Sequence, residues 1–177
     1  MNSEKTAVAE IGNDRTAVLL KTVLLVGTVV VSPLFFAQPI TGVFVNMALV
    51  LAAMYFGVSA EALLVAVLPS IVAAFRGQLP TPFIPLIPFI VAGNIILIAT
   101  VHFTFRKYGN FALSAALGSL LKFVFLAVVG IISATTLFSG SALFSTVLAM
   151  FGWLQLATAL GGSVLAFGIL RVFRREE

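Results

Sequence analysis

Four polar side chains stand inside long apolar runs of this sequence, and their types are suited to binding a ligand. Lys122 lies in ALGSLLKFVFLAVVGII and has no carboxylate within a helical turn, while Asn46 lies in VFVNMAL. Asn94 lies in AGNIIL and Gln155 in WLQLATALGG. An ammonium group donates hydrogen bonds, and amide groups both donate and accept them. Together they predict a site for an anionic or carbonyl group of a small molecule, although each amide alone is also typical of a link between two helices.

The side chains that most enzymes use are scarce. The only aspartate, Asp14, precedes the first apolar run, and the only histidine, His102, has no acid or serine around it in a recognisable motif. The sequence has no H-E-x-x-H spacing, no glycine-rich phosphate loop and no set of paired carboxylates in its apolar runs. The absence of cysteine excludes thiolate metal sites and cysteine nucleophiles. We predict neither an enzyme nor a cofactor; the weakest alternative is an enzyme acting on lipid, with His102 or Glu61 as base.

The composition indicates whether these side chains lie in a soluble protein or in a membrane protein. Hydrophobic residues make up 61% of the 177 residues and charged residues 9%, whereas a soluble domain has about 25% charged residues. The net charge of +4 is gathered in short clusters beside apolar runs. This placement is typical of membrane topology rather than of nucleic-acid binding. The sequence therefore predicts an integral membrane protein with a single domain.

Each helix that crosses a bilayer needs about 20 apolar residues, and six runs approach or exceed this length. We therefore predict an all-α bundle of six transmembrane helices over residues 17–173. An N-terminal tail at 1–16 precedes it and a short C-terminal end at 174–177 follows it. The six predicted helices span 17–36, 41–56, 60–75, 84–105, 111–138 and 144–173.

The basic residues set the predicted orientation of this bundle. They gather before the first run, between the fourth and fifth runs, and at the end of the chain. With six crossings all three clusters fall on one side, which the positive-inside rule assigns to the cytoplasm. The opposite loops contribute one basic residue, Arg76. We predict a multi-pass protein of the cell membrane with both termini cytoplasmic; the clusters are Lys5, Arg15 and Lys21, then Arg106 and Lys107, then Arg171, Arg174 and Arg175.

The four polar side chains of the apolar runs lie at related depths. Lys122 is about eleven residues, or about 16 Å, into the fifth run, close to the middle of a hydrocarbon core that is ~30 Å thick. Its stem is too short to carry the charge to either interface. Asn94 and Gln155 lie at a similar depth, and Asn46 lies in the outer half. The sequence predicts one cavity, open to the outside; the alternative is a lysine that bonds to carbonyl or amide groups and links helices.

The outer loops and nearby aromatic residues complete the predicted site. The stretch RGQLPTPFIPLIP holds four of the seven prolines, so we expect a stiff cover over the outer end, with Gln38 and Thr41 facing it. Arg76 at its base is expected to steer anions inward or to contact a lipid headgroup. Trp153 and Phe151 are expected to form either an aromatic wall for a flat ligand or part of an interfacial aromatic belt.

Several stretches resemble a transporter family. With its six short helices, the chain resembles the substrate-binding S components of energy-coupling factor transporters over about residues 17–173. The resemblance is found in four stretches: ITGVFVNMALVLAAMYFG, VAVLPSIVAAFRGQLP, PLIPFIVAGNIILI and WLQLATALGG. The resemblance implies an outward pocket, a transmembrane coupling protein (the T component) and two cytoplasmic ATPases as partners. It also implies an S component that topples in the membrane. The Ala-x-x-x-Ala pattern of many family members is missing from the first run, TAVLLKTVLLVGTVVV, which leaves the docking face open.

We therefore expect a monomeric, lipid-embedded subunit that binds a small vitamin-like molecule for uptake, with Lys122 meeting a carboxylate or another electron-rich group. The rival expectation is a small membrane subunit without transport activity that anchors or assembles partner proteins, in which Lys122 is a packing hydrogen-bond donor. The identity of the substrate and the roles of Glu61 and His102 stay open at this stage.

Overall fold

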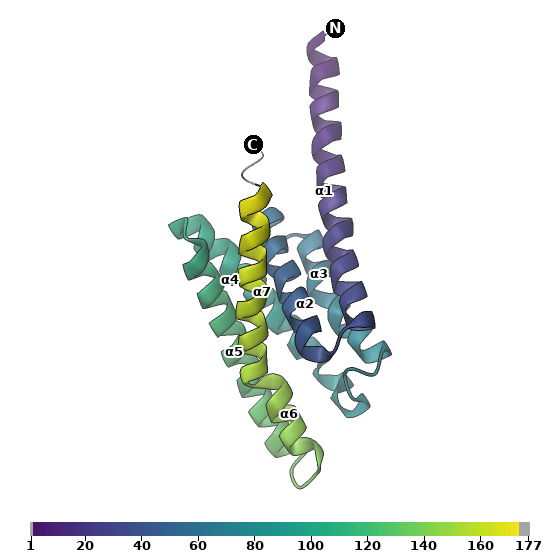
Figure 1. Cartoon of the computed structure of the whole chain (residues 1–177), viewed down its shortest axis with the longest axis vertical. Helices are drawn as coiled ribbons and strands as arrows, with labels where there is room; N and C mark the ends of the chain where they lie inside the picture. The colour runs from purple at the N-terminus through teal and green to yellow at the C-terminus, as the bar shows by residue number, and fades with distance from the viewer. Residues whose placement is uncertain (1, 174–177) are drawn as a thin grey trace.

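The computed structural model describes the backbone of residues 2–173 and the side chains of residues 15–172. The predicted C-terminal end and the side chains of Lys5, Arg174 and Arg175 lie outside the described residues. Within them every regular element is a helix, which confirms the predicted all-α membrane bundle (Figure 1). The elements are α1 (Asn2–Phe35), α2 (Gln38–Tyr55), α3 (Ala60–Phe75), the 3₁₀ helix η1 (Thr81–Leu86), α4 (Ile87–Tyr108), α5 (Phe111–Thr136), α6 (Leu143–Phe151) and α7 (Trp153–Phe173).

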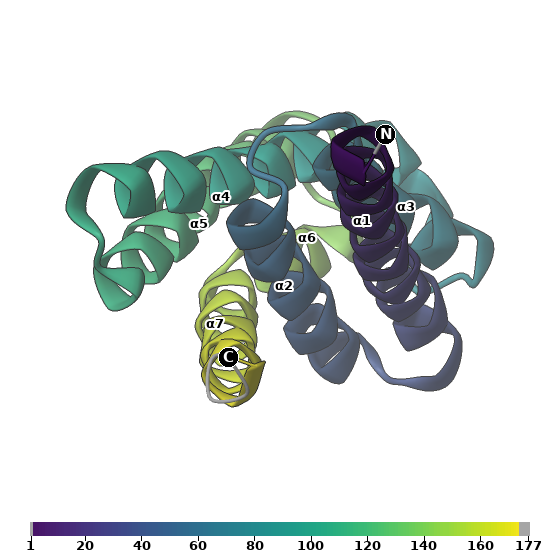
Figure 2. The same ribbon diagram turned by 90° about the horizontal axis from the view of Figure 1, so that it is seen from above.

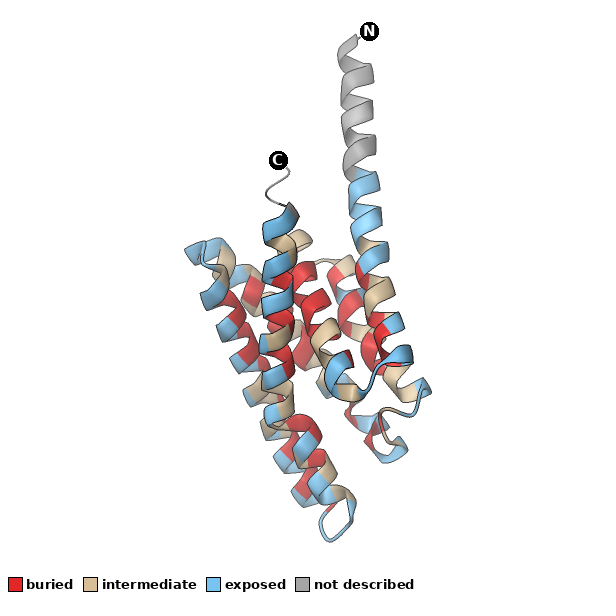
Figure 3. Ribbon diagram, viewed as in Figure 1, coloured by how far each residue is buried: buried red, intermediate tan, exposed pale blue. Residues whose placement is uncertain are grey.

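Five helical stretches of the described chain are long and apolar enough to cross a membrane, and the 16-residue α3 is a shorter apolar helix. Figure 3 shows exposed residues on the outer faces of the bundle. Many of the exposed residues have large apolar side chains, as expected of a protein surrounded by lipid. The chain is therefore a multi-pass membrane protein. The five long stretches are Arg15–Phe35, Gln38–Tyr55, Thr81–Tyr108, Phe111–Thr136 and Leu143–Val172.

The structure differs from the sequence prediction in the last crossing, which is divided into α6 and α7 at Gly152. A Cβ atom at Gly152 would lie 2.6 Å from the carbonyl oxygen of Leu148, so a larger residue does not fit this backbone. The proline-rich stretch also forms a defined element, because η1 buries the ring of Phe83 edge-on against Phe138 at 5.1 Å between centroids.

Helix α2 is the centre of the bundle and packs against α1, α3, α4 and α7 (Figure 2). Its residues from Val45 to Ala53 are all buried. The approach of α7 is especially close, because a Cβ atom at Gly162 would lie 2.5 Å from the backbone nitrogen of Met47. Small residues permit such contacts between membrane helices, where packing rather than water drives association.

One end of the bundle is basic. The start of α1 and the end of α7 lie at this end (Figure 1). Arg106 and Lys107 occupy the last turn of α4, and Arg171 occupies the last turn of α7. The ammonium group of Lys21 lies 4.7 Å above the ring of Tyr55, at the end of α2. The α1–α2 turn, η1 and α6 lie at the opposite end (Figure 1).

The contact between α2 and α7 makes a first prediction. We expect Gly162→Ala to destabilise the protein by about 1–3 kcal/mol, because the added methyl group overlaps the backbone of α2. Gly168→Ala is the matched control on the same helix, since nothing lies within 4 Å of its added Cβ and alanine favours helix over glycine by ~1 kcal/mol. Thermal unfolding in mild detergent, followed by circular dichroism, measures both. Equal stability of the two variants would contradict the close packing.

Candidate functional site

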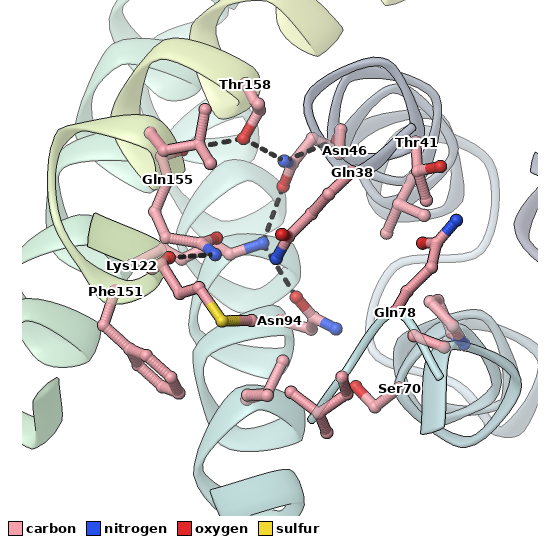
Figure 4. Close-up of a pocket in the computed structure, with 18 residues that line it drawn as sticks. Gln38, Thr41, Asn46, Ser70, Gln78, Asn94, Lys122, Phe151, Gln155 and Thr158 are labelled. Carbon is pink, nitrogen blue, oxygen red and sulfur yellow. Dashed lines mark hydrogen bonds between the residues drawn. The ribbon is translucent and has the colours of Figure 1, made fainter. Parts of the chain in front are cut away.

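The ammonium group of Lys122 is held between two asparagine side chains in the interior of the bundle. Its Nζ atom donates to Oδ1 of Asn46 on α2 at 2.6 Å and to Oδ1 of Asn94 on α4 at 2.8 Å (Figure 4). All three side chains are only 2% exposed. The structure thus brings together three of the residues that the sequence singled out, from three different helices.

The two asparagine side chains are themselves fixed by further hydrogen bonds. Nδ2 of Asn46 donates to the carbonyl oxygen of Gly42 at 2.8 Å and to Oγ1 of Thr158 on α7 at 3.2 Å. Nδ2 of Asn94 donates to the carbonyl oxygen of Ala66 on α3 at 2.8 Å. Because each NH₂ group is occupied in this way, each amide oxygen is turned toward Lys122. The network therefore joins α2, α3, α4, α5 and α7.

The charge of Lys122 has no ionic partner among the described residues. Glu61 is the one acidic side chain in residues 15–172, and it accepts a hydrogen bond from Ser59 at the start of α3. The two asparagine oxygens use two of the three N–H groups of the ammonium. A buried charge is costly unless it is paired and hydrogen-bonded. A negative group of a ligand is one partner that would compensate this charge.

A cavity of about 120 Å³ adjoins this network (Figure 4). Lys122, Asn46 and Asn94 are buried in its wall, whereas Gln38 and Gln78 are half-buried and lie on the α1–α2 and α3–η1 sides. Of the predicted site residues, Lys122, Asn94, Gln155, Asn46 and Gln38 all line this space. The remaining lining residues are Thr41, Gly42, Val45, Pro69, Ser70, Ala73, Leu79, Ile90, Met150, Phe151, Leu154 and Thr158.

Ser70 adds a free polar group to the cavity. Its side chain is 5% exposed, and its Oγ atom has no hydrogen-bond partner among the described residues. Buried polar groups are nearly always hydrogen-bonded. A polar atom of a ligand in the cavity is one partner that would satisfy this hydroxyl group.

The break at Gly152 also shapes the cavity. The side chain of Gln155 folds back and donates from Nε2 to the carbonyl oxygen of Met150 at 2.9 Å, near the end of α6. Helix α7 starts beside the cavity, and Leu154 and Gln155 of its first turn line it. The first turn of a helix carries a partial positive charge. Lys122 and the start of α7 therefore both favour a negative group.

Two predicted site residues lie elsewhere. Trp153 is 74% exposed and stacks on Phe123 at 5.0 Å between centroids, outside the cavity. The guanidinium group of Arg76 donates to the carbonyl oxygen of Leu34 at 2.8 Å, so it ties the α3–η1 loop to the end of α1. A cation at a helix C-terminus is stabilising there. Arg76 does not line the cavity.

Three polar residues that line the cavity were not predicted from the sequence. Thr158 follows Gln155 by three positions, which places both on one helix face. Its place in the cavity could therefore have been predicted from that of Gln155. Gln78 donates to the carbonyl oxygens of Pro33 and Phe36, both at 2.7 Å, and thereby fixes the rim of the cavity. Ser70 carries no sequence signal, because serine is common where membrane helices pack.

His102 and Glu61 lie away from the cavity. The ring of His102 packs beside Gly57 in the α2–α3 turn, where a Cβ atom would approach it to 2.7 Å. Glu61 is in the first turn of α3, next to the same turn. No group of three or more potential metal ligands occurs in the part of the chain that the structure describes.

Comparison of this chain with protein-family models, curated proteins and solved structures finds no match. The class of the protein therefore comes from the fold and the site alone. It is a multi-pass α-helical membrane protein with a small polar cavity around a buried ammonium group.

The network makes a second prediction. We expect Asn94→Leu to destabilise the protein by about 1–3 kcal/mol, because the variant leaves the Lys122 ammonium with one hydrogen bond. Adding Lys122→Met should recover part of this loss, since the double variant no longer buries a charge. A double-mutant cycle on thermal or denaturant unfolding measures the coupling, which we expect to be about 0.5–3 kcal/mol. Purely additive effects would show that the lysine and asparagine are energetically independent.

Proposed function

We propose that this chain is a membrane-embedded substrate-binding subunit for the uptake of a small vitamin-like molecule, and that the cavity at Lys122 is its binding site. The observation that carries the proposal is the buried ammonium group in the wall of a cavity, a group that has no negative partner among the described residues. The unpartnered hydroxyl group of Ser70 in the same cavity adds a second polar group that a ligand would complete.

The basic end of the bundle supports a direction for this uptake. Basic segments stay in the cytoplasm, so both termini would face inward. The cavity lies toward the other end, between Gln38 of the α1–α2 region and Gln78 of the α3–η1 loop. On this reading the subunit resides in the cell membrane and its pocket opens to the extracellular side.

The energy for uptake would come from partner proteins. The sequence has no phosphate-binding glycine loop of an ATPase. The resemblance to S components supports a monomeric binding subunit, surrounded by lipid, that works with a transmembrane coupling protein and two cytoplasmic ATPases. The described fold, an all-α bundle with one polar cavity and no other domain among its described residues, is compatible with such a division of labour.

The interactions in the cavity suggest how the ligand is held. A hydrogen bond between Lys122 and an anionic group is worth about 1.5–3 kcal/mol, which sets selectivity more than total affinity. Apolar side chains such as Val45, Ile90 and Phe151 supply contact area. The volume of about 120 Å³ lies below the ~300 Å³ of the smallest drug-sized pockets, so this space suits a small ligand or one part of a larger one.

One observation favours the second candidate, an assembly subunit without transport activity. Lys122 already makes two hydrogen bonds that link α2, α4 and α5 without any ligand. In that role the cavity would hold water, and the chain would bind only partner proteins. The two candidates differ in whether a small molecule binds at Ser70.

The test is native mass spectrometry of the protein purified in mild detergent, with denaturing extraction to identify any bound molecule. We expect one small molecule per chain. Ser70→Ala should weaken its affinity about 2- to 10-fold, as expected for one neutral hydrogen bond, without loss of stability, because the hydroxyl group has no partner to lose. Ser119→Ala is the matched control: Ser119 is equally buried and unpartnered but lies outside the cavity.

A clean ligand-free mass, with a thermal stability that no compound in a panel of vitamins and metabolites changes, would overturn the binding proposal in favour of the assembly subunit. Equal ligand affinity in Ser70→Ala and wild type would remove Ser70 from the site.

A further inference from the structure

A second space lies on the outside of the bundle, between α5 and the α6–α7 break. Its volume is about 220 Å³, larger than that of the polar cavity. No charged side chain lines it. Ile131 and Trp153 on its border are 55% and 74% exposed, so this groove faces the surrounding lipid. Its lining residues are Phe123, Ala127, Gly130, Ile131, Leu148, Phe151, Gly152 and Trp153.

Phe151 lines both the polar cavity and the apolar groove, and it is the one residue that they share. Its side chain is 2% exposed, and in Figure 4 it lies on the border of the cavity beside Lys122 and Gln155. The position of Phe151 depends on Gly130 of α5, where a Cβ atom would lie 2.6 Å from Cβ of Phe151. Phe151 therefore lies between the Lys122 cavity and the lipid-facing groove and contacts both.

The backbone around Phe151 allows a passage between these two spaces to open. Phe151 is the last residue of the nine-residue helix α6, and the chain leaves the helical conformation at Gly152, with φ −89° and ψ −141°. Residues that end helices absorb hinge motions in many proteins. A change of the Phe151 rotamer, or a small tilt of α6 about Gly152, would join the two spaces into one channel from Lys122 to the lipid.

From this arrangement we propose that the ligand is an amphipathic monoanion: a carboxylate, or a similar singly charged head, with an unbranched apolar tail. The inference rests on the proposed function of the Lys122 cavity. The head would bind Lys122, whose one uncompensated charge calls for one negative charge. The tail would pass Phe151 and lie in the groove along Ala127 and Ile131.

Three features of the site favour this class of ligand over a compact polar one. The polar cavity is too small for most whole metabolites but has room for a head group. The groove is mostly apolar, with no charged side chain in its lining and the indole N–H of Trp153 as its one polar side-chain group. Because the groove opens to lipid, the tail needs no closed pocket around its far end.

The experiment uses butyrate, hexanoate and octanoate with the full chain in lipid nanodiscs, and measures affinity by calorimetry at known free aqueous concentrations. Affinity should rise about fourfold for each added methylene group, the equivalent of ~0.8 kcal/mol. Octanamide, which has the same chain but no charge, should bind at least about tenfold more weakly than octanoate, because a hydrogen bond to a charged group is worth about 1.5–3 kcal/mol.

Two variants on α5 locate the tail. Ala127→Phe fills the groove without touching the polar cavity, so butyrate should bind as in wild type while the gain from longer chains disappears. Val128→Phe is the matched control, because Val128 is 50% exposed and does not line the groove; it should keep the full gain. Ser70→Ala, which removes no hydrogen bond of the fold, should weaken all three acids equally.

The outcomes separate this inference from the proposed function. If chain length has no effect, or if Ala127→Phe and Val128→Phe behave alike, the tail does not use the groove, which is then filled by bilayer lipid only. If no carboxylate binds while a neutral or dianionic molecule co-purifies and depends on Ser70, the ligand class is wrong and the binding function stands. If no small molecule binds at all, the binding function itself is wrong.

Discussion

A lysine ammonium group held between two asparagine oxygens is the interaction on which the rest of this bundle depends. Moving a charge from water into the interior of a membrane protein is costly. Lys122 is tolerated there because Asn46 and Asn94 offer their oxygens at 2.6 and 2.8 Å. Those oxygens are available only because the amide NH₂ groups bond to α2, α3 and α7. One charge thereby fixes the relative positions of five helices.

The cavity lies against the same network. Polar side chains that hydrogen-bond around Lys122 line the cavity together with apolar ones, and the first turn of α7, after the broken last crossing, contributes Leu154 and Gln155 to the lining. At the rim, Arg76 and Gln78 bind the carbonyl oxygens at the end of α1. These bonds hold the outer loops in place over the cavity. A rim tied by hydrogen bonds and a buried ammonium group are the features on which the proposed binding site rests, and Phe151 lies between it and the lipid-facing groove.

Much of this could be predicted from the sequence, for physical reasons. Apolar runs of sufficient length specify the crossings, since the bilayer leaves a helix few alternatives. Polar residues inside the runs must find one another, so the common depth of Lys122 and Asn94 anticipated their contact. The break at Gly152 was not predictable, because one glycine in a helical run is usually tolerated. The position of Trp153 depends on that break: it begins a new helix and turns outward onto Phe123.

The hydrogen bond of Arg76 was not predictable for a related reason. Sequence shows that a cation stands in an outer loop, but only the fold shows that the carbonyl oxygens at the end of α1 lie within its reach. For Ser70, the fold shows instead that a partner is missing. Its hydroxyl group has no hydrogen-bond partner among the described residues, and a local sequence pattern does not show that a hydrogen bond is missing.

We infer that the cavity around the Lys122 ammonium group opens on the side of the membrane opposite the basic end of the bundle. Because the chain has no cysteine, Ser70→Cys gives a single thiol in that cavity. We would measure its reaction in intact cells with anionic and cationic membrane-impermeant methanethiosulfonates, each relative to its rate with a free thiol. We expect labelling from outside that is faster with the anionic reagent, and we expect this preference to disappear when Lys122→Met is added. The buried Ser119→Cys control, outside the cavity, should not be labelled. No labelling of Ser70→Cys from outside, or a faster reaction with the cationic reagent, would contradict this inference.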